Sequence, residues 1–391
     1  MERKVSIVLV GIGGYGNEYV NALLDNSELK GLTIAGVVDP FPEGSRRLHE
    51  IKSNGIQVFN TLDEFYRTKH ADLAVISSPI HFHKDQSCLA LSRGSNVLCE
   101  KPVAASVVEA NEMLYAKEKS GKFLSIGYQW SYSKSILKLK KDIISGRFGK
   151  PESLKTIVLW PRNKSYFSRK WAGKIKDDEG RLVLDSVVNN ATAHYLHNMF
   201  FILGSEIDRS DIPVRVKAEL YKVNDIENFD TAALHIKSKN GADIYFYASH
   251  AILESHGPIF EYVFENGVVS YDGSMRNCNI KAKLNNGEVI DYGNPYEEPM
   301  QKLWVSISAI RGESKITCPI EAAIPHVICI EGIHRSAIPR EFPLSVKRFD
   351  IKSEITWVEG LSDLLLQCYS NSSLPSETNI YWAQAGDVVY T

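Results

Sequence analysis

The chain has 391 residues, of which 44% are hydrophobic and 24% charged, and its formal net charge is −2. At about 100–200 residues per domain, this length predicts two domains with substantial cores rather than a disordered chain. The near balance of 45 basic and 47 acidic side chains excludes the strongly basic composition of proteins that bind nucleic acid or anionic membranes. We therefore expect neither a nucleic-acid partner nor a membrane partner.

The six cysteines form no Cys-x-x-Cys pair, which indicates reduced thiols in a reducing compartment. The N-terminus runs straight into a strand pattern, so we expect no signal peptide. No apolar run approaches the ~20 residues that span a bilayer. These features together predict a cytoplasmic protein.

Over about the first 125 residues, continuous apolar runs alternate with helix patterns, as is typical of strands buried on both faces of a parallel sheet. Segments 61–64 and 106–109 have the Ser/Thr-x-x-Glu spacing of a capping box, and Asn-Gly at 54–55 fits a helix end. The alternation predicts a doubly wound α/β Rossmann domain over residues 1–127. Its expected strands cover residues 5–10, 33–38, 57–59, 73–77, 96–99 and 123–126.

Residues 128–391 have a different pattern. Asn-Gly pairs at 240–241, 266–267 and 286–287 each separate two strand-like runs. Such pairs are a strong hairpin signal, because both central residues of a type I′ turn take positive φ. We expect an α+β domain with an open antiparallel sheet, used for substrate binding and oligomerisation. Helices are expected near residues 133–145, 191–203, 298–310 and 320–336, the last able to pack back on the first domain, and at 361–368 before an irregular tail, 371–391.

A glycine motif, G-x-G-x-x-G, stands at the end of the first expected strand. Gly11 permits a tight turn, Gly13 lets the backbone approach a pyrophosphate, and Gly16 lets the following helix pack closely. The helix N-terminus then offers N–H groups and a positive dipole to the phosphates. The predicted cofactor loop consists of Gly11, Ile12, Gly13, Gly14, Tyr15 and Gly16.

Asp39 ends the second expected strand, about 23 residues beyond Gly16, where the dinucleotide fingerprint places an acidic residue. A carboxylate there accepts hydrogen bonds from the adenosine ribose and repels a 2′-phosphate. NAD is therefore the predicted cofactor. Arg46 and Arg47 follow closely in the sequence, so NADP remains the second choice.

Two further motifs are Ser78-Pro79-Ile80-His81-Phe82-His83 and Cys99-Glu100-Lys101-Pro102. Together with the glycine motif and Asp39, they resemble the glucose–fructose oxidoreductase / inositol dehydrogenase (Gfo/Idh/MocA) family over about residues 4–340. The resemblance implies a Rossmann domain followed by an open-faced antiparallel sheet, and a homodimer or homotetramer formed through that sheet.

Ligands of an open α/β sheet bind beyond the carboxyl ends of its strands. The residues expected there, beside the nicotinamide, are Ser78, Pro79, His83, Glu100, Lys101 and Gln129. In the family, the lysine that matches Lys101 stabilises or relays charge at the reacting oxygen, so Lys101 is predicted to be catalytic and to bind substrate. His83 matches a histidine that the family often carries, and it is expected to order the loop near the cofactor rather than to perform chemistry.

The family's second motif is an acid, three residues, a histidine, two residues and an acid. The matching positions are Asn190, His194 and His197, so only the histidine is kept. Their i, i+4, i+7 spacing predicts one helix face that presents them to substrate, with His194 as the catalytic base. Loss of the first acid would remove the carboxylate that holds this histidine, and it leaves open how base function divides between Lys101 and His194.

Trp171 closes an aromatic and basic cluster ahead of this motif and is a further candidate for substrate binding. The pairs His81-x-His83 and His194-x-x-His197 have zinc-ligand spacing, but hydride transfer needs no metal, and none is predicted. The predicted activity is an NAD-dependent dehydrogenase that acts on a secondary alcohol of a sugar, cyclic polyol or glycoside. Two alternatives stay open: a glycoside-cleaving enzyme that retains NAD and oxidises transiently, and a non-catalytic NAD(H) sensor.

Overall fold

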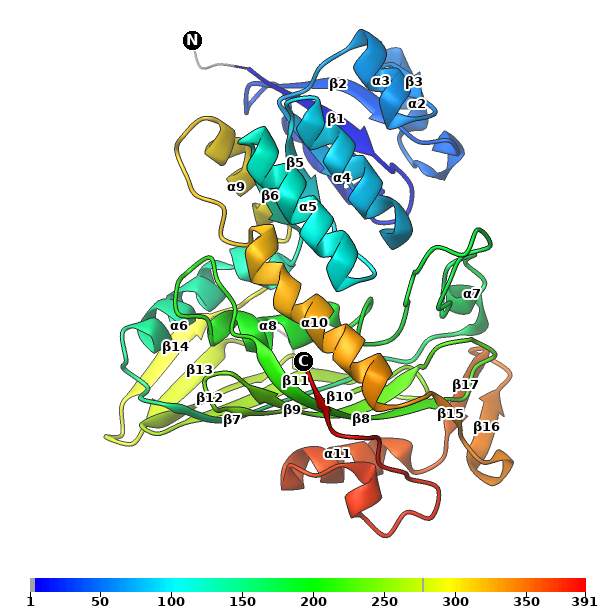
Figure 1. The fold of residues 1–391 in the computed structure, drawn as a ribbon, viewed down its shortest axis with the longest axis vertical. Helices are drawn as coiled ribbons and strands as arrows, with labels where there is room; N and C mark the ends of the chain where they lie inside the picture. Colours follow the sequence, from blue (N-terminus) through cyan, green and yellow to red (C-terminus); the bar gives the residue numbers. More distant parts are fainter. Residues whose placement is uncertain (1–3, 276–277) are drawn as a thin grey trace. The chain divides into compact units, whose positions relative to one another are not determined.

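The computed structural model describes residues 4–275 and 278–391, and these form two compact units (Figure 1). Unit 1 comprises the described residues up to Tyr132 together with residues 298–324. Unit 2 comprises the described part of residues 133–297 together with residues 325–391. The return of residues 298–324 to unit 1 is a feature that the expected boundary at 127/128 does not include.

Unit 1 contains a parallel sheet of six strands in the order β3-β2-β1-β4-β5-β6, counted over the described residues. This is the doubly wound Rossmann arrangement, in which the strand order reverses between β1 and β4. The fold prediction for the first domain is confirmed. Its strands are β1 (Val5–Val10), β2 (Leu32–Val38), β3 (Val58–Phe59), β4 (Leu73–Ile76), β5 (Asn96–Cys99) and β6 (Leu124–Ile126).

The strands of this sheet are mainly apolar, and β4 is buried at every residue, as expected for a parallel sheet with helices on both faces. The helix α9 (Gln301–Ile310) adds Leu303 and Ile307 to the same core as β1 and α1. The other helices of unit 1 are α1 (Gly16–Asn26), α2 (Leu48–Ser53), α3 (Leu62–Thr68), α4 (His83–Ser92) and α5 (Val107–Ser120), with α10 (Ile320–Ser336) contributing its first turn.

The local helix signals are confirmed with one exception. Thr61 and Glu64 form the complete capping box at the start of α3, and Gly55 takes φ +71 just after α2. At α5, Ser106 accepts the Glu109 N–H, but the Glu109 carboxylate accepts the Ala105 N–H instead of closing the box on Ser106. Only half of that predicted box therefore forms.

Unit 2 is built on a large sheet in the order β14-β13-β12-β11-β7-β10-β9-β8-β15, with β18 also paired to β8. The sheet is largely antiparallel, as predicted, although β7 pairs with β10 and β15 pairs with β8 in parallel. Its strands are β7 (Pro151–Leu159), β8 (Pro213–Lys222), β9 (Thr231–Ser238), β10 (Asp243–Ser249), β11 (His256–Phe264), β12 (Gly267–Asp272), β13 (Ile280–Leu284), β14 (Val289–Gly293), β15 (Arg340–Glu341) and β18 (Val389–Tyr390).

All three predicted hairpins are present, but their turns are not type I′. Gly241 and Gly287 take positive φ, whereas Asn240 and Asn286 do not, and Gly267 already belongs to β12. The first and third connections are four residues long, and in longer hairpin loops a single glycine in the left-handed region follows an ordinary turn. The second connection has only two residues, Glu265 and Asn266, and neither takes positive φ.

The helices of unit 2 pack on opposite faces of the sheet (Figure 1). On one face, Asn198 of α8 donates to the Tyr262 hydroxyl of β11, which in turn lies 3.3 Å from the Thr156 hydroxyl of β7. The remaining helices and strands of the unit are α6 (Lys134–Ile144), α7 (Lys164–Phe167), α8 (Ala193–Ile202), the rest of α10, α11 (Leu361–Asn371), and the hairpin β16 (Lys347–Asp350) with β17 (Ile355–Val358).

Part of the opposite face of the sheet is covered by α11. Ile157, Leu159 and Tyr247 form a buried apolar cluster with Leu365 and Cys368 of α11. The tail, residues 371–391, was expected to be irregular, but its strand β18 pairs with β8 and so adds to the sheet. A dimer or tetramer built on this face remains a prediction, and it has to use surface that residues 340–391 leave exposed.

None of the helices in the described ranges is long and apolar enough to cross a bilayer.

Because α11 packs on this apolar cluster of the sheet, we expect α11 to stabilise unit 2. Leu365 is fully buried, so Leu365→Ala should lower the free energy of unfolding of this unit by about 2–5 kcal/mol. Ile351→Ala is the matched control, because Ile351 is 84% exposed and should change stability by less than about 0.5 kcal/mol. Urea unfolding monitored by tryptophan fluorescence measures both. Equal losses of stability in Leu365→Ala and Ile351→Ala would contradict the packing of α11 on the sheet.

Candidate functional site

The glycine loop closes as a turn that only glycine permits at two positions. Gly11 takes φ +79, and a Cβ there would lie 2.8 Å from the Ser77 carbonyl oxygen. A Cβ on Gly16 would lie 2.1 Å from the Gly11 carbonyl oxygen. At Gly14, by contrast, a Cβ would meet nothing within 4 Å, so the outer side of the loop leaves room for a ligand.

Helix α1 begins directly after this loop, and no described side chain caps its first turn. Its N–H groups and the positive end of its dipole therefore suit an anionic group such as a pyrophosphate. The Ile12 side chain is fully buried in the core, so this residue contributes its backbone to the loop. Tyr15 is 44% exposed beside it.

Asp39 is fixed against the glycine loop. One carboxylate oxygen accepts the Ile12 N–H at 2.9 Å, and the other accepts the Phe41 N–H at 2.8 Å. The side chain remains partly exposed at the end of β2. A carboxylate at this distance from the loop fits the ribose of a dinucleotide whose phosphates lie on α1.

His83 ties together the loops that follow β4 and β5. Its Nε2 lies 2.9 Å from the Ser78 carbonyl oxygen, and its Nδ1 lies 2.8 Å from the Pro102 carbonyl oxygen. Burial lowers the pKa of His83, and a neutral imidazole donates to only one of these carbonyls at a time. Because both ring nitrogens face backbone, His83 orders these loops and presents no ring nitrogen to a cofactor.

Ser78 and Pro79 are partly exposed after β4, and Gln129 is partly exposed in the short 3₁₀ turn Gln129–Tyr132 after β6. The Ser78 hydroxyl donates to the Gln86 side chain at 2.6 Å. These residues and Lys101 follow strands β4, β5 and β6 at the carboxyl edge of the sheet, as the sequence predicted.

Glu100, the residue before Lys101, is buried and pairs with Lys302 of α9, whose side chain is 1% exposed. The carboxylate also accepts the Tyr19 hydroxyl at 2.5 Å and the Lys101 N–H at 3.2 Å. Burial alone would raise the pKa of Glu100, but the Lys302 ammonium and Tyr19 together lower it. Glu100 is therefore ionised and positions the Lys101 backbone from inside the protein.

Sequence reasoning missed Lys302, because it lies 202 residues from its partner. The signal was a single charged residue, Lys302, in the run Gln301–Ile310. Gly127 shows how closely the pair is packed: its carbonyl accepts a bond from Lys302 at 3.3 Å, and a Cβ on it would lie 2.8 Å from the Glu100 carboxylate.

In unit 2, Asn190 does not share a helix face with His194 and His197, which corrects the predicted arrangement. Helix α8 begins at Ala193, and Asn190 lies in the turns before it. The Asn190 amide donates to the Asp185 carboxylate at 2.8 Å. An acid therefore does lie beside this position, supplied from five residues earlier in the chain.

The two histidines of α8 have different surroundings. His194 is half-buried in the first turn. His197 is 1% exposed and stacks on Phe201. Burial, with His326 and Lys140 nearby, lowers the pKa of His197 well below its usual range. This setting makes His197 part of the packing of unit 2 rather than a group facing substrate.

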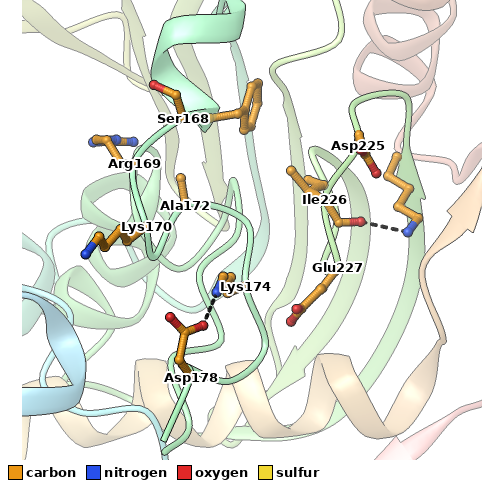
Figure 2. Close-up of a pocket in the computed structure, with 11 residues that line it drawn as sticks. Ser168, Arg169, Lys170, Ala172, Lys174, Asp178, Asp225, Ile226 and Glu227 are labelled. Atoms are coloured by element: carbon orange, nitrogen blue, oxygen red, sulfur yellow. Dashed lines mark hydrogen bonds and ion pairs between the residues drawn. The ribbon is translucent and has the colours of Figure 1, made fainter. Parts of the chain in front are cut away.

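A cavity of about 600 Å³ lies within unit 2 (Figure 2), and Trp171 stands in the sequence between two of its lining residues, Lys170 and Ala172. The Trp171 indole ring is 4.3 Å from the Arg169 guanidinium, and Arg169 lines the cavity. In the described ranges, no three His, Cys, Asp or Glu side chains come close enough together to hold a metal ion.

Comparison with known proteins supports the assignment of the glycine loop and Asp39 to a nucleotide site. Residues 5–128 match the model of the Gfo/Idh/MocA family, described as "Oxidoreductase family, NAD-binding Rossmann fold". The resemblance seen in the sequence is thereby confirmed over residues 5–128, a segment that matches the NAD-binding Rossmann fold of that family.

Two curated relatives match with low identity. Glucose-6-phosphate 3-dehydrogenase of Bacillus subtilis is 24% identical over 218 residues, covering 56% of this chain and 59% of that protein. Inositol 2-dehydrogenase of Salmonella paratyphi B is 26% identical over 144 residues, covering 37% and 42%. The chain thus matches about half the length of these relatives.

The fold extends further than the sequence match. The structure of the WlbA dehydrogenase from Bordetella pertussis, in complex with NADH and UDP-GlcNAcA, superimposes with a TM-score of 0.69. The match covers 85% of this chain and 96% of that one at 20% identity. This likeness shows that the two-domain fold is shared.

The buried pair of Glu100 and Lys302 predicts that removing the lysine reverses the pH dependence of the protein's stability. Lys302→Met should cost about 3–5 kcal/mol near neutral pH, because it leaves the Glu100 charge buried and unpaired. In the wild type the depressed pKa of Glu100 adds stability above its unfolded value, and this is lost as pH falls through the folded value. In the variant burial dominates and raises that pKa, so thermal stability should increase from about pH 8 to about pH 5.

Lys119→Met, which removes an exposed lysine from α5, should change neither the stability nor its pH profile. If Lys302→Met does not fold, the double variant Glu100→Gln, Lys302→Met should recover folding. A Lys302→Met protein that loses stability on acidification exactly as the wild type does would contradict the ionised pair.

Proposed function

We propose that the protein is an NAD-dependent dehydrogenase that oxidises, or in reverse forms, a secondary alcohol of a sugar, cyclic polyol or glycoside. The observation that carries this proposal is the position of Lys101. It follows the carboxyl end of β5, on the same sheet edge as the glycine loop after β1 and Ser78 after β4. That edge, at the reversal of strand order, is where open α/β sheets bind their ligands.

The relatives support the choice of substrate class. The two curated proteins are named as dehydrogenases of a sugar phosphate and of inositol, and the structural neighbour was solved with NADH and a nucleotide sugar. All three ligands carry secondary alcohols. The shared fold and the family of residues 5–128 support the same class for this chain.

Oxidation of a secondary alcohol removes a proton from oxygen and a hydride from carbon. NAD, when bound, supplies the hydride acceptor. The Lys101 ammonium would stabilise negative charge as it develops on the substrate oxygen, and His194 would accept the proton. The Asp185 carboxylate accepts a hydrogen bond from the Asn190 amide and so holds the turn that leads into α8.

The second half of the proposal is cofactor choice. Asp39 is held with one carboxylate oxygen on the Ile12 amide and the other on the Phe41 amide, which fixes its negative charge beside the loop. A second negative charge, that of a 2′-phosphate, would be repelled there. Arg47 does not offset this, because it pairs with Asp25 and Glu50.

Asp39→Ala should therefore weaken NAD binding by about 10–100-fold and narrow the preference over NADP, because bonds from hydroxyls to a charged acceptor are lost. Titration calorimetry with NAD and NADP measures both affinities. Asp63→Ala, which removes a partly exposed carboxylate of α3, should leave them unchanged. Tighter binding of NADP than NAD by the wild type would overturn the assignment of Asp39.

Lys101→Met should lower kcat by about 10²–10⁴-fold, the usual contribution of one positioned acid–base group, while NADH binding stays nearly unchanged. The assay follows NADH absorbance with a panel of sugars, inositols and glycosides. Lys119→Met controls for the loss of one surface charge from unit 1. Turnover close to wild type in Lys101→Met would refute the mechanism and leave the cofactor site standing.

The same panel separates the alternatives left open by the sequence. A glycoside-cleaving enzyme that oxidises only transiently would release sugar from a glycoside without net NADH. A sensor would bind NADH and turn over none of the panel. Net NADH formation from a free sugar or polyol is the outcome that the proposed dehydrogenase requires.

A further inference from the structure

The segment that follows β7 is strongly basic. Residues 160–176, the basic loop, contain six lysines and arginines and neither aspartate nor glutamate. The acids that come next are already engaged: Asp178 pairs with Lys174, and Asp177 with Arg181. Within the part of the chain that the structure describes, neither Arg162 nor Arg169 has a carboxylate partner.

Both arginines are held on the ring of Tyr166. The Arg169 guanidinium lies 3.9 Å from the ring centroid, and its Nε donates to the Tyr166 carbonyl at 2.9 Å. The Arg162 guanidinium lies 5.0 Å from the same centroid, with its Nη1 donating to the Pro161 carbonyl. Stacking and backbone bonds thus fix two positive charges in place before any ligand binds, which reduces the entropy lost on binding.

The charge of this cluster does not depend on the neighbouring histidine. His250 is 2% exposed, packs 5.4 Å from the Tyr166 ring, and places Nδ1 2.8 Å from the Trp160 carbonyl oxygen. Burial and the charges of Arg162 and Arg169 lower the pKa of His250 to about 3. Near neutral pH the imidazole is uncharged, so the charges around Tyr166 are the two arginines and the carboxylate of Asp185.

Charged side chains of both signs line the cavity beside this cluster (Figure 2). Arg169 and Lys170 lie on one side, and the carboxylates of Asp225 and Glu227 lie on the other. Two further lysines of the lining are already engaged: Lys174 pairs with Asp178, and Lys222 donates to the Ile226 carbonyl. The cavity volume of about 600 Å³ is within the range of small-molecule sites. Carboxylates accept bonds from sugar hydroxyls, whereas guanidinium groups bind oxyanions with paired N–H donors.

We propose that this cavity binds a sugar bearing an oxyanion, a carboxylate or a phosphate, with Arg169 binding the anionic group and Asp225 accepting hydroxyls. Arg162, which also lies against the Tyr166 ring, adds a second positive charge. The assignment rests on the proposed function in that it names the charged subclass of its sugar substrates. The binding step itself involves unit 2 alone and can be measured without NAD.

The test is ligand-observed NMR on the full chain with D-glucuronate, D-glucose 6-phosphate and D-glucose as probes. Glucuronate or glucose 6-phosphate should bind at least about tenfold more tightly than glucose. Tighter binding of glucuronate identifies a carboxylate as the anionic group, and tighter binding of glucose 6-phosphate identifies a phosphate. Arg169→Gln should abolish that advantage. Lys164→Gln removes one positive charge from the same loop outside the cavity lining, and it should keep most of the advantage.

Glucuronate binding should also stay constant between about pH 6 and about pH 8, because arginine does not titrate there and His250 stays neutral. Equal binding of all three sugars by the wild type would overturn the proposal, as would equal losses in Arg169→Gln and Lys164→Gln. NADH titration and the Lys101→Met assay are independent readouts, so the dehydrogenase proposal stands or falls separately. Loss of NADH binding in Arg169→Gln would reassign the arginine to the cofactor and refute the sugar subsite.

Discussion

The buried ion pair between Glu100 and Lys302 is the constraint on which the nucleotide site depends. Its carboxylate receives Tyr19 from the helix after the glycine loop, the backbone of Lys101 after β5, and Lys302 from α9. Two charges removed from water are tolerated only when both are fully paired, so these segments are held in one arrangement. The Glu-Lys-Pro motif thus combines a buried, paired carboxylate with a partly exposed lysine.

Local signals in the sequence were enough to predict the Rossmann half of the chain. The capping box at Thr61, the helix end at Gly55 and the closure of Gly11 against Ser77 each depend on residues close in sequence or on a backbone demand that only glycine meets. The hairpins were found for the same reason, but their turn type was not. Turn type depends on loop length and on which residues occupy the loop, and at 266–267 the glycine already belongs to the strand.

What the sequence could not show depends on contacts between distant residues. Lys302 becomes a site residue only when α9 returns to the first sheet, and Asp185 neighbours Asn190 only because the chain turns before α8 begins. His83 and His197 matched or adjoined family positions, yet burial assigns one to loop ordering and the other to packing. Periodicity gives the face a residue occupies in an element, but not where that element starts.

The cover over the sheet of unit 2 has a consequence for how this protein responds to dilution. Apolar strand surface that a second subunit shields is exposed whenever the subunits separate, so its protection depends on protein concentration. Here Leu365 and Cys368 arrive on the same chain as Ile157 and Tyr247, joined by a continuous backbone. Shielding of that patch is intramolecular, and it persists at any concentration at which the chain is folded.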